Sequence, residues 1–477
     1  MSRDALVVGS GPNGLAAAIV MARAGLDVTV LEGASEPGGG CRTAEVTAPG
    51  YRHDVCSTIQ SLLSLSPFYA SLDLASHGVA LRRAPVALAH PLGGGRAAAL
   101  TMSVDETAAG LGVDGPAYRA LLRPLVEHAP TLAATLLAPI RTPPRHLGGL
   151  AHFARHGLGS ARHLAARFSG DAARAMVGGI AAHAMMPLDR AMTAGYGLFL
   201  ATSAHADGWP VVEGGSAALV GALVELLGDA GGRVECGRWV RAAGDLPPAA
   251  ATLFDTSVAT LTDVAGTRVG ARYRRGASRY RYGPGVCKVD WALNAPVPWS
   301  APECARATTV HVGGLFDDIA AAEADVAAGR HPERPFVIVV QPGVVDPTRA
   351  PEGHSTLWAY AHVPSGSDVD VTERIEAQVE RFAPGFRDVV VARTTTTASQ
   401  FAAYNPNYVG GDINGGAGDL RQLVFRPTVQ WNPYRAARGL YLCSSATPPG
   451  GGVHGMCGVG AARTALADLG VRDLGAS

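Results

Sequence analysis

The sequence of 477 residues has no excess of charge, because 40 basic residues balance 40 acidic ones and leave a formal net charge of +0. A nucleic-acid partner is therefore not expected, since binding phosphates requires a basic excess. No uninterrupted apolar run reaches the roughly 18–20 residues that would cross a bilayer. The first expected strand begins at Ala5, which leaves no room for a signal peptide. These absences predict a soluble, cytoplasmic protein.

Cysteine is scarce and shows no pairing pattern. The seven cysteines form no C-x-x-C pair and no spacing typical of a metal site, and their odd number is unlike a disulfide scaffold. We therefore expect a reduced protein without a bound metal.

Lysine is nearly absent, because Lys288 is the only one and all other basic residues are arginine. Where a chain rich in alanine, glycine and arginine keeps a lysine, the position can be one that needs a compact, titratable ammonium. The alternative is a surface position at which either residue serves equally well.

What the sequence does contain is a dinucleotide fingerprint near its start. Residues 5–8 form a short apolar run typical of a buried parallel strand. Gly9, Gly11 and Gly14 then supply G-x-G-x-x-G, whose glycines permit a tight turn, close approach of a pyrophosphate and close packing of the next helix. Residues 15–24 predict that helix, whose N-terminal amides and dipole would face the phosphates.

An acidic residue completes the fingerprint. Residues 28–31 predict a second strand, and Glu32 follows it directly, 21 residues after Gly11. A carboxylate at this place can accept hydrogen bonds from the hydroxyls of an adenosine ribose. Strand, glycines, helix, strand and acid therefore stand in the order that a dinucleotide site requires.

A second glycine cluster follows the acid. Residues 37–43 read PGGGCRT and contain Gly38, Gly39 and Arg42. This extension resembles the E-x-x-x-x-x-G-G-x-x-R-T pattern of flavoproteins related to carotenoid desaturases and amine oxidases. The resemblance implies that Gly38, Gly39 and Arg42 contact FAD, with the arginine near its phosphates, although Arg42 stands one or two places later than is usual.

The segment that leads out of this unit contains His53, Asp54 and Cys56. In an extended chain, His53 and Val55 would share one face, and Asp54 and Cys56 the other. Three interpretations remain open: a catalytic cysteine with its base, a loop that lines the flavin or substrate pocket, and a purely structural segment. Relatives in the desaturase-like group carry a similar His-Asp-x-Cys-Ser stretch.

Residues 67–205 have a different texture, dominated by amphipathic helical patterns. Within them, residues 141–174 are locally basic and also contain large apolar side chains. This run predicts either a helix on a membrane surface, which would admit a lipophilic substrate, or an ordinary solvated helix face. A later amphipathic pattern over residues 371–383 predicts a helix whose solvated face carries Glu373, Glu376 and Glu380.

The chain then returns to the dinucleotide fold. Gly-Gly-Ser at 214–216, a helical pattern to 227 and a strand from Arg233 resemble the point at which desaturases and amine oxidases re-enter their FAD domain. In that group a strand residue just after this point touches the adenine, and Val240 is the matching position. Residues 252–256 predict the next strand of the same sheet.

Residues 285–293, GVCKVDWAL, alternate well enough to predict a strand with Lys288 and Asp290 on one face. The segment is similar to the amine oxidase strand whose lysine holds a water against flavin N5, which makes Lys288 a candidate catalytic residue. The alternatives are a structural ion pair with Asp290 and an exposed bystander.

Candidate pocket residues lie in two further segments. The glycine-rich residues 405–418 predict a loop, and the equivalent loop of desaturase-like proteins lies near the flavin edge. This loop and the helical region supply the candidates Asn407, Tyr408, Asp412, His183, Met185 and Met186.

The C-terminal motif is the most specific after the fingerprint. Residues 439–443 predict a strand, residues 450–456 read GGGVHGM, and an alanine-rich helix follows. Backbone amides at the start of such a helix supply the positive potential that stabilises a reduced flavin, and they do so without a mobile charged side chain. The motif closely resembles the C-terminal FAD motif of phytoene-desaturase-like oxidoreductases, with Ser444-Ser445 where many relatives have Gly-Asp. The resemblance assigns Gly451, Gly452 and Val453 to the cofactor, and His454 is a candidate catalytic residue.

Together these motifs resemble phytoene-desaturase-like and amine-oxidase-superfamily FAD-dependent oxidoreductases over nearly the full length. The implied fold is α/β, with a Rossmann-type, glutathione-reductase-like FAD-binding domain built from residues 1–66, 206–270 and 425–477. An α+β substrate domain is inserted as residues 67–205 and 271–424. FAD is expected to be non-covalent, because Cys443 and Cys457 lack the amine oxidase attachment pattern.

The implied activity is removal of hydride from a C–H of a small apolar or unsaturated substrate, as in a desaturase or dehydrogenase, or a redox-neutral isomerisation. Two alternatives remain. Lys288 favours a flavin amine oxidase, and the GDP-dissociation-inhibitor proteins, which bind prenylated partners without needing FAD, resemble this fold. The intact glycines, Glu32 and residues 450–455 argue against that non-enzymatic class.

Overall fold

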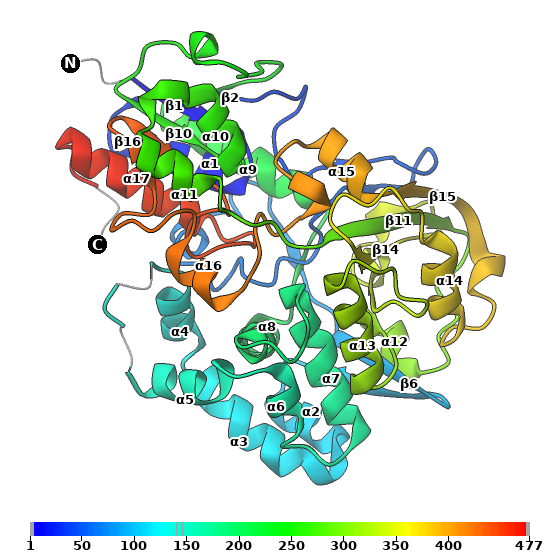
Figure 1. Ribbon diagram of the computed structural model, residues 1–477. Coiled ribbons are helices and arrows are strands. Elements are labelled where there is room, and N and C mark those ends of the chain that lie inside the picture. Colours follow the sequence, from blue (N-terminus) through cyan, green and yellow to red (C-terminus); the bar gives the residue numbers. More distant parts are fainter. Residues whose placement is uncertain (1–3, 140–141, 145–146, 474–477) are drawn as a thin grey trace.

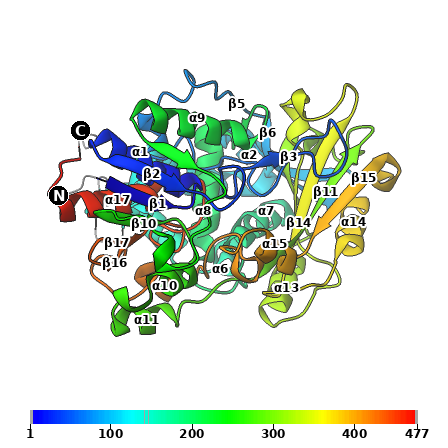
Figure 2. The ribbon, with the colours of Figure 1, turned by 90° about the horizontal axis from the view of Figure 1, so that it is seen from above.

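Two large sheets and a layer of helices make up the fold. The computed structural model describes residues 4–139, 142–144 and 147–473. Figure 1 shows the sheet built around β1 (Asp4–Val8) at the upper left and the sheet containing β11 (Gly285–Leu293) at the right. Seen from above in Figure 2, the two sheets stand at opposite ends of the molecule.

The first sheet is of the Rossmann type. Its order is β16-β17-β10-β1-β2-β9, and all neighbours are parallel except β16 and β17. Its other strands are β2 (Asp27–Leu31), β9 (Arg233–Glu235), β10 (Ala251–Phe254), β16 (Arg435–Ala437) and β17 (Leu440–Leu442). Three separate stretches of the chain therefore supply this sheet, with the fingerprint strand β1 near its centre.

Helices cover both faces of the first sheet, because successive strand residues point to opposite sides. One face is buried by α1 (Pro12–Arg23), α9 (Ser216–Asp229) and α17 (Met456–Leu469), and the other by α10 (Val258–Ala265) and α11 (Ala271–Ala277). The first turns of α1 and α17 lie side by side, since a Cβ on Gly458 would stand 1.9 Å from the carbonyl oxygen of Asn13.

The second sheet has the order β15-β11-β14-β13-β12-β6-β7, and only β6 and β12 run parallel. Its core on one face is shared with α14 (Thr372–Glu380), and on the other with α13 (Phe316–Ala327). Its remaining strands are β6 (Val86–Gly93), β7 (Arg96–Leu100), β12 (Ala307–Val312), β13 (Val337–Val340), β14 (Ser355–Val363) and β15 (Val390–Thr396).

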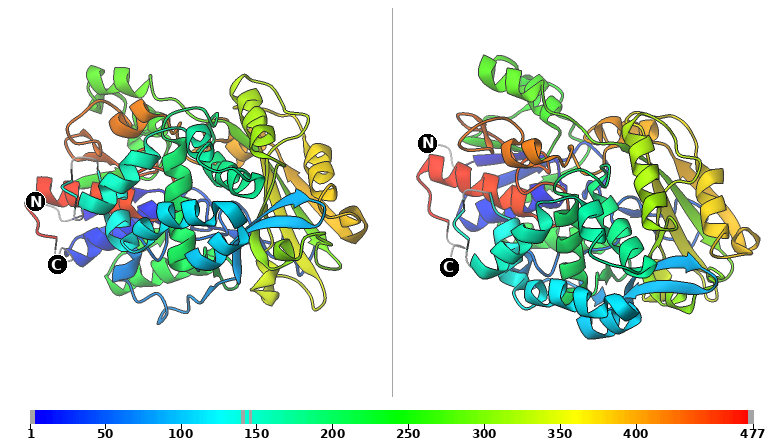
Figure 3. Two further views of the ribbon diagram at one scale, coloured as in Figure 1. Left: turned by 90° about the horizontal axis from the view of Figure 1, so that it is seen from below. Right: turned by 60° about the horizontal axis from the view of Figure 1, so that its bottom comes forward.

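Helices from residues 104–207 form a layer beside both sheets, which Figure 3 shows in cyan to teal. Their apolar sides meet in one core that also contains residues of β6 and β7. The helices are α2 (Val104–Gly110), α3 (Gly115–Val126), α4 (Ala129–Leu136), α5 (Leu147–Gly157), α6 (Ala161–Ala165), α7 (Asp171–Ala181) and α8 (Thr193–Asp207). Shorter elements are β3 (Thr43–Ala44), β4 (His53–Asp54), β5 (Leu81–Arg82), β8 (Val211–Val212), α12 (Pro302–Ala305), α15 (Ala398–Tyr404) and α16 (Leu420–Phe425).

The basic run of residues 141–174 does not form a single helix. Its described part falls on α5, α6 and the start of α7, and Arg162 pairs with Asp317 of α13 at 2.8 Å. Arg141, Arg145 and His146 lie outside the described residues. Membrane contact of this run stays a prediction. No helix in the described part of the chain combines the length and the apolarity needed to cross a membrane.

Two expectations about single residues are wrong. Val240 is not in a strand, because β9 ends at Glu235 and an irregular segment follows. Glu376 is not on a solvated face but 2% exposed, since its carboxylate accepts hydrogen bonds from the Trp291 indole at 3.0 Å and the Arg393 guanidinium at 2.7 Å. The indole lies in the core of the second sheet and requires a buried acceptor. The domain boundaries proposed from the sequence stay a prediction.

Candidate functional site

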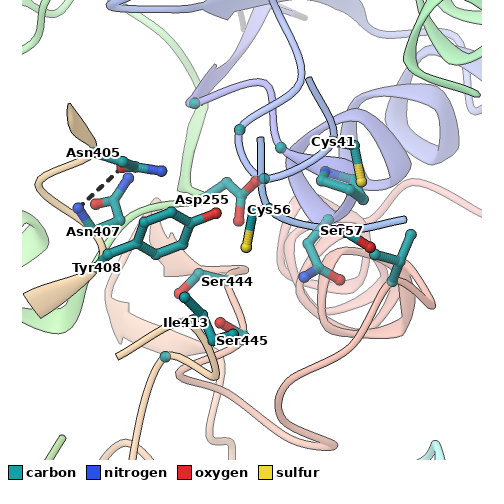
Figure 4. Close-up of a pocket in the computed structure, with 18 of the residues that line it drawn as sticks. Cys41, Cys56, Ser57, Asp255, Asn405, Asn407, Tyr408, Ile413, Ser444 and Ser445 are labelled. Atoms are coloured by element: carbon teal, nitrogen blue, oxygen red, sulfur yellow. Dashed lines mark hydrogen bonds between the residues drawn. The ribbon is translucent and has the colours of Figure 1, made fainter. Parts of the chain in front are cut away.

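A cavity of about 420 Å³ extends from the glycine loop after β1 to the second sheet. Its walls come from both sheets, from the segment after β4 and from residues 404–415. Figure 4 shows Tyr408 projecting into the cavity from one side, Cys56 and Ser57 on another, and Ser444 and Ser445 below. The cavity therefore has a dinucleotide end, a middle and an end formed by the second sheet.

The glycines at the dinucleotide end pack too closely for any side chain. A Cβ on Gly9 would lie 2.7 Å from the carbonyl oxygen of Asp255, and one on Gly14 would lie 2.2 Å from that of Gly9. Gly9 also has a φ of +96°, which favours glycine. Gly39 contacts Gly11 directly, since its Cβ would lie 3.1 Å from the Gly11 Cα. The two glycine loops thus form one bare backbone surface, which is the cradle that a pyrophosphate requires.

Glu32 stands at the rim of this cradle with its carboxylate held by the chain. One oxygen accepts hydrogen bonds from the Ser10 amide at 3.0 Å and hydroxyl at 2.6 Å, and the other from the Ala34 amide at 2.8 Å. Arg42 lies 3.4 Å from Glu32 and donates to the Tyr404 hydroxyl at 3.1 Å. Both side chains line the cavity, so a carboxylate and a guanidinium flank the glycines where ribose and phosphates would lie.

An aromatic side chain that the sequence did not indicate closes the same end. Trp239 packs flat on Gly33, because a Cβ there would come within 2.7–2.9 Å of three ring atoms. Trp239 and Val240 both line the cavity. Val240 thus has the predicted neighbourhood although its backbone is not a strand. The sequence did contain one signal for Trp239: it directly precedes Val240, the position expected to touch the adenine.

Asp255 is a second residue that sequence reasoning missed. It follows β10, lines the cavity, and accepts a hydrogen bond from the Gly14 amide at 2.9 Å. Burial raises the pKa of its carboxyl to about 7, against the lowering effect of the Gly14 and Gly11 amides. An acidic residue directly after a buried parallel strand was the available signal, since such positions face the ligand crevice of α/β sheets.

The C-terminal motif contributes the middle of the cavity. Gly452 and Val453 line it together with Ser444 and Ser445, whereas Gly451 packs against Asn414 instead. His454 is fully buried and held by backbone groups on both ring nitrogens: Gly450 O lies 3.1 Å from Nε2, and the Met456 amide donates to Nδ1 at 3.0 Å.

Burial lowers the pKa of His454 to about 4, so its imidazole is neutral and positions the start of α17. A catalytic role for His454 stays a prediction.

Of the pocket residues predicted in the loop of residues 405–418, two line the cavity and one does not. Asn407 and Tyr408 line the cavity, and a Cβ on Gly40 would lie 2.5 Å from the Tyr408 hydroxyl. Asp412 is instead fully buried and accepts hydrogen bonds from the amides of Gly283 and Asn414 at 2.7 and 2.8 Å. It holds the loop rather than a ligand.

Lys288 is 2% exposed and forms the predicted ion pair with Asp290 at 2.5 Å. Its ammonium also donates to the backbone oxygen of Asp54 at 3.2 Å, and Asp290 lies 3.4 Å from His53. Lys288 is not among the described residues that line the cavity. A catalytic role for it stays a prediction, while the ion pair itself is present.

In the His-Asp-x-Cys segment, Asp54 has a structural role and Cys56 lines the cavity. Asp54 accepts hydrogen bonds from the Ser216 amide at 2.8 Å and from the Arg349 guanidinium at 3.0 Å, so it joins the start of α9 to the loop before β14. Cys56 lines the cavity, but burial raises the pKa of its thiol, which disfavours a nucleophilic thiolate. Of the three interpretations, the geometry supports a pocket loop anchored by a structural carboxylate.

The end at the second sheet is apolar and aromatic. Ile338 and Val340 of β13, Trp358 of β14, and Leu200 and Trp209 from the helical side line it. His183 also lines it, whereas the buried Met185 and Met186 do not. Among the described lining residues, the carboxylates are Glu32 and Asp255, both at the dinucleotide end.

Comparison with known proteins agrees with this geometry. A family model described as an NAD(P)-binding Rossmann-like domain matches residues 7–70. The chain is 26% identical to pyridine nucleotide-disulfide oxidoreductase domain-containing protein 2 of Rattus norvegicus, over 98% of this chain and 94% of that protein. It is 30% identical to the neurosporene-forming phytoene desaturase of Rhodobacter capsulatus, over 26% of this chain and 25% of that enzyme.

In sequence and in fold, the chain is similar to phytoene-desaturase-like and amine-oxidase-superfamily oxidoreductases. The structure of putrescine oxidase bound to putrescine has the same fold, with a TM-score of 0.62, 17% identity, and coverage of 98% of this chain and 99% of that one. The α/β fold expected from the sequence is therefore confirmed, and these similar proteins support the expected superfamily. The desaturase and the oxidase among these similar proteins are oxidoreductase enzymes.

Proposed function

We propose that this oxidoreductase binds FAD non-covalently and removes hydride from a C–H of an uncharged, largely apolar substrate. The carrying observation is one continuous cavity that joins a bare glycine cradle to an aromatic and aliphatic end without a carboxylate. The adenosine would lie between Glu32 and Trp239, and the pyrophosphate against Gly11 and Gly39. When bound, FAD supplies the hydride acceptor.

The residues of this chain would bind, orient and keep water out. Trp209 and Trp358 would enclose the substrate, and Tyr408 with the Ser444-Ser445 turn would border the reacting region between the two ends. Cys443 and Cys457 are fully buried, and the Cys457 thiol donates to Thr447 O and Gly450 O at 3.4 Å, which supports non-covalent binding. The tight packing of Gly9, Gly11 and Gly14 supports a retained cofactor over the non-enzymatic class.

A flavin amine oxidase is the second candidate, favoured by the fold shared with putrescine oxidase. An ammonium substrate would have no counter-charge at the substrate end, because the described residues that line it include no anion. To separate the two, FAD-loaded protein is mixed without oxygen with limonene, with a linear polyene and with putrescine. Loss of the long-wavelength flavin absorbance with a hydrocarbon supports the proposal, and loss with putrescine alone overturns it in favour of the oxidase.

A change of pH is expected to alter FAD affinity through Asp255. Its carboxyl, with a pKa of about 7, is protonated below that pH and becomes charged above it, beside the proposed phosphates. We expect FAD affinity to fall several-fold between about pH 6 and pH 8 in the unmodified protein and to stay level in D255N. Quenching of flavin fluorescence on binding measures both.

The exposed Asp263 provides the control, and D263N should keep the pH dependence of the unmodified protein. The raised pKa also means that the folded apoprotein holds this proton more tightly than the unfolded chain. Its stability should therefore fall as the pH rises from the ordinary carboxyl range toward 7. An affinity that is independent of pH in both proteins contradicts the placement of the phosphates beside Asp255.

A further inference from the structure

The wall that the second sheet contributes to the cavity is apolar with a few polar exceptions. Register places Thr309 opposite Val340, Val340 opposite Trp358, and Ile338 opposite Tyr360, so these side chains share one face. Val340 and Ile338 are aliphatic, and most of the Trp358 side chain is an apolar ring system. Thr309 and Tyr360 are the polar members, and they need partners that an apolar wall does not supply.

A pair of imidazoles meets this wall from the helical side. His183 lines the cavity, and its Nε2 lies 2.9 Å from Nε2 of His311, which is fully buried on β12 two residues after Thr309. One hydrogen bond between two ring nitrogens uses a single proton. The remaining nitrogen of His183, Nδ1, is then the polar atom that the pair can offer to the cavity.

The pair is neutral. Burial lowers the pKa of His183 to about 3, assisted by His362, and holds the pKa of His311 well below its usual range. His183 is also fixed in orientation, because its ring stands edge-on to Trp209 at 6.0 Å between centroids. A neutral, oriented imidazole can accept a hydrogen bond from a hydroxyl in one tautomer and donate to a carbonyl in the other.

Thr309 supplies a second, independent observation. It lines the same cavity and is 1% exposed, and its hydroxyl has no hydrogen-bond partner among the described residues. Buried hydroxyls without a partner are rare in folded proteins, and such a group at a ligand cavity points to a partner on the ligand.

We propose that the substrate carries a neutral oxygen function, a hydroxyl or a carbonyl, which binds between His183 and Thr309. This inference rests on the proposed function, because it takes the far end of the cavity as the substrate site. An ammonium is disfavoured, since the carboxylates among the described lining residues stand at the dinucleotide end and are held by Ser10, Ala34 and Gly14. A pure hydrocarbon would leave both polar groups unpaired.

The test compares two probes that differ by one hydroxyl. Limonene and perillyl alcohol are equilibrated by dialysis against FAD-loaded protein, and the bound fraction of each gives its Kd. We expect the alcohol to bind about tenfold more tightly, the value of one hydrogen bond to a buried group. In H183L the alcohol should fall to the affinity of the hydrocarbon, whose own affinity should change less than about twofold.

Two further variants keep the result interpretable. H183Q retains a hydrogen-bonding group and should keep part of the preference for the alcohol. H205L removes another buried imidazole, which bonds to Tyr118 at 2.7 Å and does not line the cavity, and should keep all of it.

Equal binding of both probes to the unmodified protein, binding of neither, or an undiminished preference in H183L each overturns the inference. FAD uptake is checked by absorbance first, so loss of FAD binding counts against the proposed function and loss of the preference alone counts against this inference.

Discussion

Replacing Gly14 with alanine is expected to weaken binding of the proposed FAD by about 5- to 150-fold, the range that corresponds to an overpacking cost of about 1–3 kcal/mol. The added Cβ would stand 2.2 Å from the backbone oxygen of Gly9 and 3.0 Å from the carboxylate of Asp255. Neither neighbour is the free end of a flexible side chain. Helix α1 must therefore move away from β1, which opens the cradle. Titration of apoprotein with FAD, followed by fluorescence quenching, measures the loss.

The matched control is G221A, in helix α9 of the same sheet. A Cβ on Gly221 would meet nothing within 4 Å, so alanine there should leave FAD affinity unchanged and raise stability slightly through its helix propensity. Equal FAD affinity in G14A and G221A would contradict the description of the cradle.

Replacing Arg349 with methionine is expected to lower the free energy of unfolding by about 3–5 kcal/mol, the usual cost of removing one partner of a buried ion pair. Arg349 is 1% exposed and bonds to Asp54 at 3.0 Å, to Asp346 at 2.6 Å and to the carbonyl oxygen of Val212 at 3.1 Å. Methionine fills much of the space but leaves two buried carboxylates facing each other. Urea unfolding followed by circular dichroism measures the change.

An exposed ion pair supplies the comparison. Arg82 and Glu213 lie 2.7 Å apart with 51% and 34% of their side chains exposed, and such pairs contribute at most about 1 kcal/mol. R82M should therefore unfold nearly as the unmodified protein does. If R349M and R82M lower the free energy of unfolding by similar amounts, the Asp54–Arg349–Asp346 cluster does not hold the start of α9 to the loop before β14.

The cradle could be predicted from the sequence because its determinants are contiguous. Gly9, Gly11 and Gly14 come just after β1, and Glu32 directly follows β2, so local spacing alone places them together. For Lys288, the sequence predicted the strand but not the partner of the ammonium group. Its strand was correct, but whether its ammonium faces a flavin or Asp290 depends on how β11 packs against the segment after β4.

The substrate end could not be predicted, because no local pattern joins its members. His183 follows α7, Thr309 and His311 come from β12, and Trp358 from β14, and only tertiary packing brings them to one wall. Asp255 and Trp239 lie between these cases. Each is next to an element that the sequence located, but a single acid or aromatic residue there has no distinctive spacing.

Non-covalent binding of FAD is tested most directly by the absorption spectrum of the purified protein, taken before and after heat denaturation. We expect a flavin spectrum that passes completely into the supernatant when the protein is denatured, with FAD as the released compound. A colourless protein that also fails to take up added FAD would contradict it, as would flavin that stays with the precipitate.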